Sequence, residues 1–138
     1  IRRLTILTER FGSHRAVPEA FFLIGKAHYD LQQFDQALAS FKQVTERTRS
    51  EAAAKAQFYT GQVLQAKEDF KGALVAYLRI PALYGPYREW VAAASFESGK
   101  CHEAQGDKDS ARKAYQDVVT SYSDTRWAAP AADRLKLL

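Results

Sequence analysis

Three segments of the chain repeat one pattern of small, aromatic and β-branched residues. Each copy begins with a glycine (Gly25, Gly61, Gly99), and the copies are 36 and 38 residues apart. The landmarks that follow at fixed distances are alanine (Ala37, Ala73, Ala111), an aromatic residue (Phe41, Tyr77, Tyr115) and a β-branched residue (Val44, Ile80, Val118). A repeat of this length is typical of helix pairs that bury their apolar faces against neighbouring pairs. The pattern therefore predicts an all-α solenoid that presents a surface rather than a catalytic centre.

Apolar residues at three-and-four spacing place two helices in each copy. The sequence predicts helix pairs at 18–31 and 34–47, at 51–67 and 69–78, and at 87–104 and 108–122, which gives repeats over 18–47, 51–80 and 87–122. Pro81 is expected to end its helix, because proline lacks the backbone N–H and clashes with the preceding turn. Gly85 and Pro86 then predict an irregular connection to the third repeat.

The two ends of the chain resemble parts of the same series. The sequence around Phe11 and Ser13 matches that around Tyr122 and Asp124. We therefore expect residues 1–11 to be the second helix of a preceding repeat, and residues 126–138 to be a capping helix or the first helix of another repeat. Because the chain begins without Met and contains none, we interpret residues 1–138 as one solenoid domain from a larger protein.

Charge and hydropathy exclude several classes of partner. The 20 basic and 16 acidic residues give a net charge of +4, but they alternate along the chain and form no block typical of a nucleic-acid-binding arm. No stretch approaches the roughly 20 apolar residues that span a bilayer, so direct membrane insertion is not expected. The single cysteine fits a reducing compartment and a cysteine-poor extracytoplasmic protein equally well.

The sequence contains no recognisable catalytic, metal or cofactor site. Cys101 and His102 are adjacent, and neighbouring residues on a helix point in different directions, so they do not form a nucleophile–base pair. There is no HxxxH or CxxC pattern for a metal and no glycine-rich loop for a nucleotide. The repeated glycines lie inside predicted helices, where they favour close approach of the paired helix near the repeated alanines.

The landmarks that begin at Gly25, Gly61 and Gly99 resemble those of tetratricopeptide repeats, and the resemblance covers nearly the whole chain. It implies a right-handed superhelical solenoid of antiparallel helix pairs. The third repeat departs from the pattern, since Lys108 stands where the first two have Phe34 and Phe70. The segments between repeats are similar to those of bacterial envelope members, such as the outer-membrane assembly lipoprotein and the Tol-associated cell-division coordinator. This likeness slightly favours the periplasm or cell envelope over the cytoplasm.

The resemblance also implies a peptide-binding groove lined by the first helix of each repeat. Its groove positions correspond here to Phe22, Lys26, Tyr29, Phe58, Gln62, Gln65, Phe96, Lys100 and Glu103. The three phenylalanines then form either an exposed ladder that anchors a ligand or part of the core. The second alternative arises because Gln57 and Ser95 occupy the place that Phe21 holds in the first repeat.

We conclude from the sequence that the chain is a non-enzymatic scaffold, which binds a peptide segment of a partner protein without a cofactor. Two alternatives remain open. The chain can be an assembly module that self-associates through its ends or convex face, or a regulatory appendage of a larger enzyme.

Overall fold

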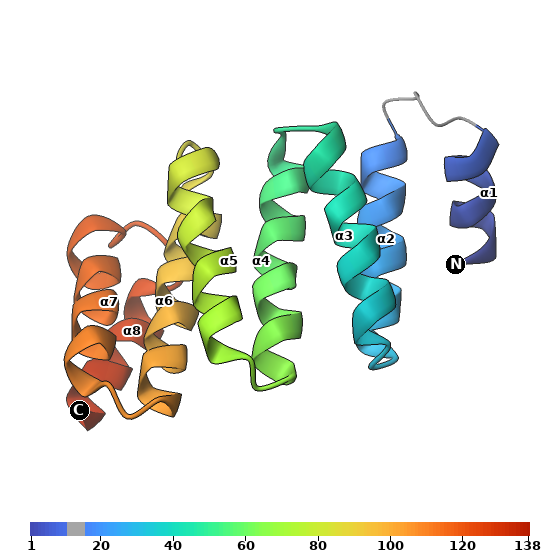
Figure 1. The fold of residues 1–138 in the computed structure, drawn as a ribbon. Helices are drawn as coiled ribbons and strands as arrows, with labels where there is room; N and C mark the ends of the chain where they lie inside the picture. Colours follow the sequence, from blue (N-terminus) through green and yellow to red (C-terminus); the bar gives the residue numbers. More distant parts are fainter. Residues whose placement is uncertain (11–15) are drawn as a thin grey trace.

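The computed structural model describes residues 1–10 and 16–138, and within them the chain forms eight α-helices and no β-strand (Figure 1). The helices are α1 (Arg2–Arg10), α2 (Val17–Asp30), α3 (Phe34–Arg47), α4 (Glu51–Ala66), α5 (Phe70–Leu83), α6 (Arg88–Ala104), α7 (Lys108–Ser121) and α8 (Ala128–Leu137). They form a helical-repeat solenoid of the predicted class. Phe11 and Ser13, on which part of the terminal matching rests, lie outside the described residues.

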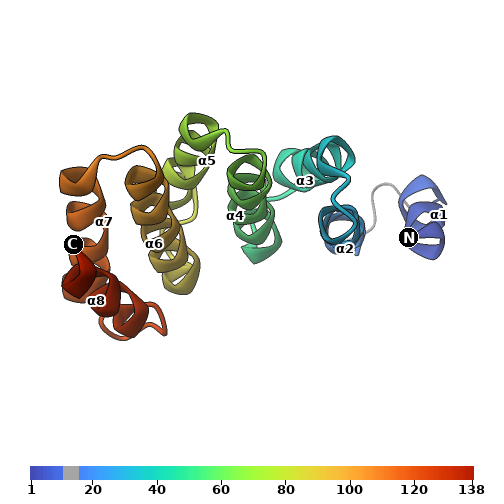
Figure 2. The ribbon, with the colours of Figure 1, turned by 90° about the horizontal axis from the view of Figure 1, so that it is seen from below.

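Three helix pairs, α2–α3, α4–α5 and α6–α7, stack side by side along the chain (Figure 2). Helix α2 lies against α4, and α4 lies against α6, whereas α3 and α5, or α5 and α7, make no comparable contact in the described part of the chain. We call the surface formed by α2, α4 and α6 the inner face, and the surface formed by α3, α5 and α7 the outer face. Helix α1 packs against α2, and α8 packs against α7.

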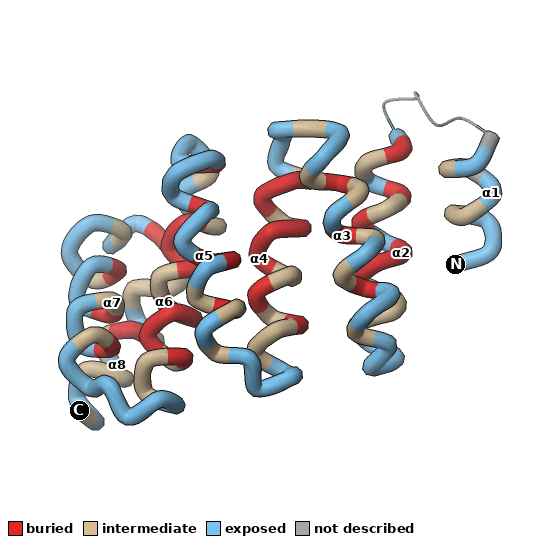
Figure 3. Tube along the Cα trace, in the orientation of Figure 1, coloured by how far each residue is buried: buried red, intermediate tan, exposed pale blue. Residues whose placement is uncertain are grey.

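The core is divided among the repeats. Three clusters of buried side chains lie between each helix pair and the first helix of the next unit: α2–α3 with α4, α4–α5 with α6, and α6–α7 with α8. Buried residues are concentrated on α4 and α6, which are covered on several sides, while the second helices expose most of their surface (Figure 3). This arrangement is expected when each repeat buries its apolar face against its neighbours.

The repeated glycines make room for the repeated aromatic rings. A Cβ atom on Gly25 would lie 2.6 Å from Cε1 of Phe41, and one on Gly99 would lie 2.7 Å from Cζ of Tyr115. Tyr77 covers Gly61 in the same way. The sequence predicts that the repeated alanines of the paired helix lie closest to the glycines. That expectation is corrected, because the space beside each glycine is filled by the aromatic ring four residues after the alanine.

The turns between paired helices share one backbone geometry. The residue seven positions after each repeated glycine adopts the left-handed backbone conformation. These residues are Gln32 (φ 60), Glu68 (φ 61) and Gly106 (φ 78). The next N–H donates to the carbonyl five residues earlier, which satisfies the end of the first helix (Gln33 to His28, 2.8 Å; Asp69 to Leu64, 2.8 Å; Asp107 to His102, 2.9 Å). In the last two turns that residue is an aspartate whose carboxylate accepts a hydrogen bond from the following helix, from Gly72 N–H (3.0 Å) and Ser110 N–H (3.1 Å).

One helix boundary differs from the sequence prediction. Helix α5 continues through Pro81 to Leu83 instead of ending before the proline. The proline removes one backbone donor, but the helical turn around it is retained, and Tyr84 N–H donates to the Ile80 carbonyl at 2.7 Å. Ile80 and Tyr84 are both buried against α6, so tertiary packing stabilises the last turn of the helix despite the proline.

In the described residues, no helix has both the length and the apolar character to cross a bilayer.

Candidate functional site on the inner face

The three phenylalanines of the predicted groove are buried rather than exposed. Their exposed fractions are 8% for Phe22, 6% for Phe58 and 9% for Phe96. The three rings therefore do not form an exposed ladder for a ligand; they are part of the core, as the second alternative predicted. Each ring is buried because it contacts an aromatic residue across a repeat boundary.

Each of these rings bridges two repeats. Within its own repeat the ring packs on the landmark aromatic residue, at centroid distances of 5.9 Å (Phe22 to Phe41), 5.7 Å (Phe58 to Tyr77) and 5.7 Å (Phe96 to Tyr115). Across the boundary it packs on an aromatic residue of the next unit, at 5.7 Å (Phe22 to Tyr59), 5.5 Å (Phe58 to Trp90) and 5.4 Å (Phe96 to Trp127). These aromatic bridges join the first helices into a continuous wall.

The predicted groove amides in the second repeat bind a side chain of the protein itself. Gln62 Nε2 donates to the Tyr77 hydroxyl at 2.7 Å, and that hydroxyl donates to Gln65 Oε1 at 2.8 Å. Burial, together with the charge of nearby Glu97, raises the pKa of Tyr77 well above its usual range, so the hydroxyl remains a donor. These two glutamines orient the tyrosine ring, which reduces their capacity to bind a ligand.

Glu103 plays the corresponding part in the third repeat. It accepts hydrogen bonds from the Tyr115 hydroxyl and from Arg134 of α8, whose Nη2 lies 2.5 Å from Glu103 Oε2. Burial opposes ionisation of Glu103, but the hydrogen bonds from Tyr115 and Arg134 outweigh it and hold the pKa of this carboxyl below its usual value. In the first repeat the equivalent pair is Tyr29 and Phe41, and Phe41 has no hydroxyl to donate.

Lys100 is also engaged within the protein. Its Nζ lies 3.4 Å from Oε2 of Glu97, whose side chain is 8% exposed, and 5.8 Å from the Phe96 ring centroid. This Glu97 oxygen is fully buried and accepts no hydrogen bond in the described part of the chain, so the ion pair with Lys100 compensates its charge there. Removing the lysine would leave a buried carboxylate without a counterion.

On the inner face, a lysine of α2 lies over partly exposed tyrosine rings of α2 and α4. Lys26 Nζ lies 5.4 Å from the Tyr29 ring centroid and 5.3 Å from that of Tyr59, and it pairs with Asp30 at 2.8 Å. The hydrogen bond to Asp30 raises the pKa of Lys26, and burial raises that of Tyr29. The two tyrosine rings are half-buried and meet edge to face at 5.9 Å.

Sequence reasoning missed Lys55 and Tyr59, which complete this cluster. Lys55 Nζ lies 5.6 Å from the Phe22 ring centroid, and no carboxylate of the described residues pairs with it. The helical spacing could have indicated both residues, because Lys55 lies one turn before Phe58 and Tyr59 lies one turn after Lys55 on the same helix face. We call Lys26, Tyr29, Lys55 and Tyr59 the lysine–tyrosine cluster.

The described residues contain no group of three or more His, Cys, Asp or Glu side chains arranged to hold a metal. Cys101 is buried, and burial raises the pKa of its thiol to about 11, so the nucleophilic thiolate is not formed near neutral pH. The lysine–tyrosine cluster places two ammonium groups next to aromatic rings on the inner face.

Comparison with protein families matches two tetratricopeptide repeat models to the chain, one over residues 22–86 and one over residues 93–125. The structure is similar to the crystal structure of MamA, with a TM-score of 0.69 and 21% sequence identity. The match covers 86% of this chain and 64% of the MamA chain, so the protein spans somewhat less than two thirds of the length of that relative. Comparison with curated protein sequences gives no significant match.

Proposed function

Because the chain belongs to the tetratricopeptide repeat family, whose members generally mediate protein–protein interactions, we propose that it is a non-enzymatic scaffold that holds a peptide segment of a partner protein against its inner face. The observation that supports this assignment is the lysine–tyrosine cluster between α2 and α4. Tyrosine rings supply contact area at a small cost in conformational entropy, and they are enriched where proteins bind one another.

The cluster favours an acidic or carboxylate-bearing segment. Lys55 has no carboxylate partner among the described residues, so its ammonium group is available to a ligand. Lys26 is held between two rings and already pairs with Asp30, which leaves it to orient a ligand rather than to dominate the affinity. The buried phenylalanines contribute indirectly, because their aromatic bridges fix the spacing of α2 and α4.

The experiment is affinity capture of partner proteins with the wild-type chain, followed by measurement of affinity for the peptide that binds. Lys55→Glu should weaken that affinity about tenfold, with a larger effect at low salt, since a charge near the interface rim acts on association rate and is screened by ions. Lys113→Glu, an exposed lysine of α7 on the outer face, is the matched control and should leave binding unchanged. Equal affinities for the wild type and the folded Lys55→Glu variant would refute the assignment.

A further inference from the structure

The outer surface of α5 carries large apolar side chains that α3 and α7 do not. Val75 is 52% exposed, Leu78 is 64% exposed and Leu83 is 48% exposed, whereas no large hydrophobic residue of α3 or α7 is exposed in the described structure. In the third repeat the position of Val75 is taken by Lys113. The apolar stripe is therefore particular to the second repeat and is not a requirement of the solenoid, and exposed apolar patches of this kind mark interaction surfaces.

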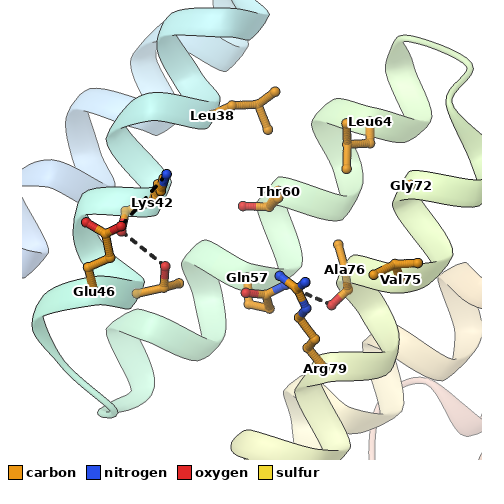
Figure 4. Close-up of a pocket in the computed structure, with 11 residues that line it drawn as sticks. Leu38, Lys42, Glu46, Gln57, Thr60, Leu64, Gly72, Val75, Ala76 and Arg79 are labelled. Carbon is orange, nitrogen blue, oxygen red and sulfur yellow. Dashed lines mark hydrogen bonds and ion pairs between the residues drawn. The ribbon is translucent and has the colours of Figure 1, made fainter.

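A cavity of about 560 Å³ adjoins this stripe, between α3 and α5 and lined also by α4 (Figure 4). Val75 and Arg79 belong both to the outer surface of α5 and to the cavity wall. The lining residues divide by helix into Leu38, Lys42, Thr45 and Glu46 of α3, Gln57, Thr60 and Leu64 of α4, and Gly72, Val75, Ala76 and Arg79 of α5. Leu38, Leu64 and Val75 give the cavity an apolar part, and its size accommodates large side chains of another protein.

The charge of the cavity is set by one unpaired group. Arg79 makes no ion pair with any described residue, and it lines the cavity together with Gln57 and Ala76 (Figure 4). On the opposite wall Lys42 pairs with Glu46 at 3.9 Å, so these two charges offset one another. The cavity therefore carries a net positive charge from Arg79, which complements a carboxylate of a partner.

We propose that the cavity and the apolar stripe of α5 form a docking site for an amphipathic helix of a partner protein. Apolar side chains of that helix would pack on Val75 and Leu78 and enter the cavity, and an Asp or Glu beside them would pair with Arg79. This is the helix-in-groove mode of recognition, in which apolar residues at i, i+3, i+4 and i+7 act as anchors. The site lies on the outer face, separate from the lysine–tyrosine cluster.

A second copy of this chain does not fit the site as well. In a symmetric dimer formed by two antiparallel α5 helices, a residue at the middle of the stripe meets its own counterpart. Arg79 lies at the middle of the stripe from Val75 to Leu83, so two guanidinium groups would face each other at the centre of the interface. The charge therefore selects an acidic helix over self-association.

The test uses a displayed library of helix-forming peptides of 14 residues, the length of α5, selected on the folded wild-type chain. We expect the enriched peptides to carry an apolar helical stripe with an adjacent Asp or Glu. Val75→Asp and Arg79→Glu should each weaken binding at least about tenfold, because they place a charge in the apolar contact and reverse the pairing charge. Both side chains are exposed, and circular dichroism melting checks that each variant folds.

Two controls separate this site from the inner face. Lys113→Asp places the same new charge at the equivalent position of α7, and Lys55→Glu changes the lysine–tyrosine cluster, so neither should affect the selected peptides. Replacing the peptide carboxylate with Lys should restore binding to Arg79→Glu. The proposal is overturned if no enriched peptide depends on Val75 and Arg79, or if light scattering shows that the wild-type chain dimerises and that Val75→Asp prevents it. Loss of peptide binding in Lys55→Glu alone would support the inner face instead.

Discussion

We expect Gly61→Ala to destabilise the fold, although helix propensity by itself predicts the opposite. Replacing a mid-helix glycine by alanine contributes about 1 kcal/mol of stability in a helix that has space for the methyl group. At Gly61 the new Cβ would lie 2.6 Å from Cζ and 2.7 Å from Cδ1 of Tyr77, about 1 Å inside an ordinary carbon contact. The ring would have to move by about that distance.

Tyr77 has little freedom to make that movement. Its side chain is 1% exposed, and Gln62 and Gln65 hold its hydroxyl at 2.7 and 2.8 Å. Overpacking in a well-filled core costs about 1–3 kcal/mol, which exceeds the gain in propensity and leaves a net loss of about 1 kcal/mol. In a chain of this length that loss lowers the melting temperature by roughly 3–5 °C.

A double-mutant cycle followed by circular dichroism isolates the ring as the cause. In the Tyr77→Leu background the aromatic ring is absent, so Gly61→Ala should become neutral or stabilising. A change of sign between the two backgrounds measures the contact directly. If Gly61→Ala raises the melting temperature of the protein that retains Tyr77, the interpretation of the repeated glycine as a site of close approach is wrong.

Two further predictions concern the hairpin turns and the third repeat. Asp69→Ala should lower the free energy of unfolding by about 1 kcal/mol, because it removes the side-chain cap of α5. Gln33→Ala, at the same position of a turn without a side-chain cap, should lower it much less. Urea titration measures both values, and equal losses would contradict the capping role. Glu103 has a lowered pKa, so its contribution to stability is present above the unfolded value of about 4.3 and is lost as pH falls through the lower folded pKa. Glu103→Gln should therefore destabilise the protein at about pH 7 but not at about pH 2, and a deficit of equal size at both pH values would show that the charge is not responsible.

The repeat period and most helix positions could be predicted because their signals are local. Glycine, alanine and aromatic landmarks recur within each repeat, and their spacing determines which faces of two adjacent helices meet. Pro81 misled the prediction for the same reason, since a local rule assigns proline to a helix end. Burial of Ile80 and Tyr84 against α6 retains the helix there, and that contact involves a repeat that begins later in the chain.

The candidate site was less predictable because its contacts cross repeat boundaries. Phe58 turns inward because Trp90 of the next repeat packs on it, and the sequence around Phe58 contains no sign of Trp90. The commitment of Gln62 and Gln65 to Tyr77 likewise depends on the relative placement of α4 and α5. Family positions therefore placed the candidate residues on the helices of the inner face, but they did not indicate which side chains are already engaged within the protein.

The aromatic bridges also bear on how the solenoid can bend. They join α2 to α4, α4 to α6 and α6 to the segment before α8, all on one side, whereas α3 and α5 are separated by the cavity. When such a solenoid bends, the inner face, where the helices are joined, keeps its length, and the spacing of the helices on the outer face increases or decreases. Side chains of a docked helix that enter the cavity between α3 and α5 would thus push these two helices apart, and they would change the curvature of the inner wall without touching it.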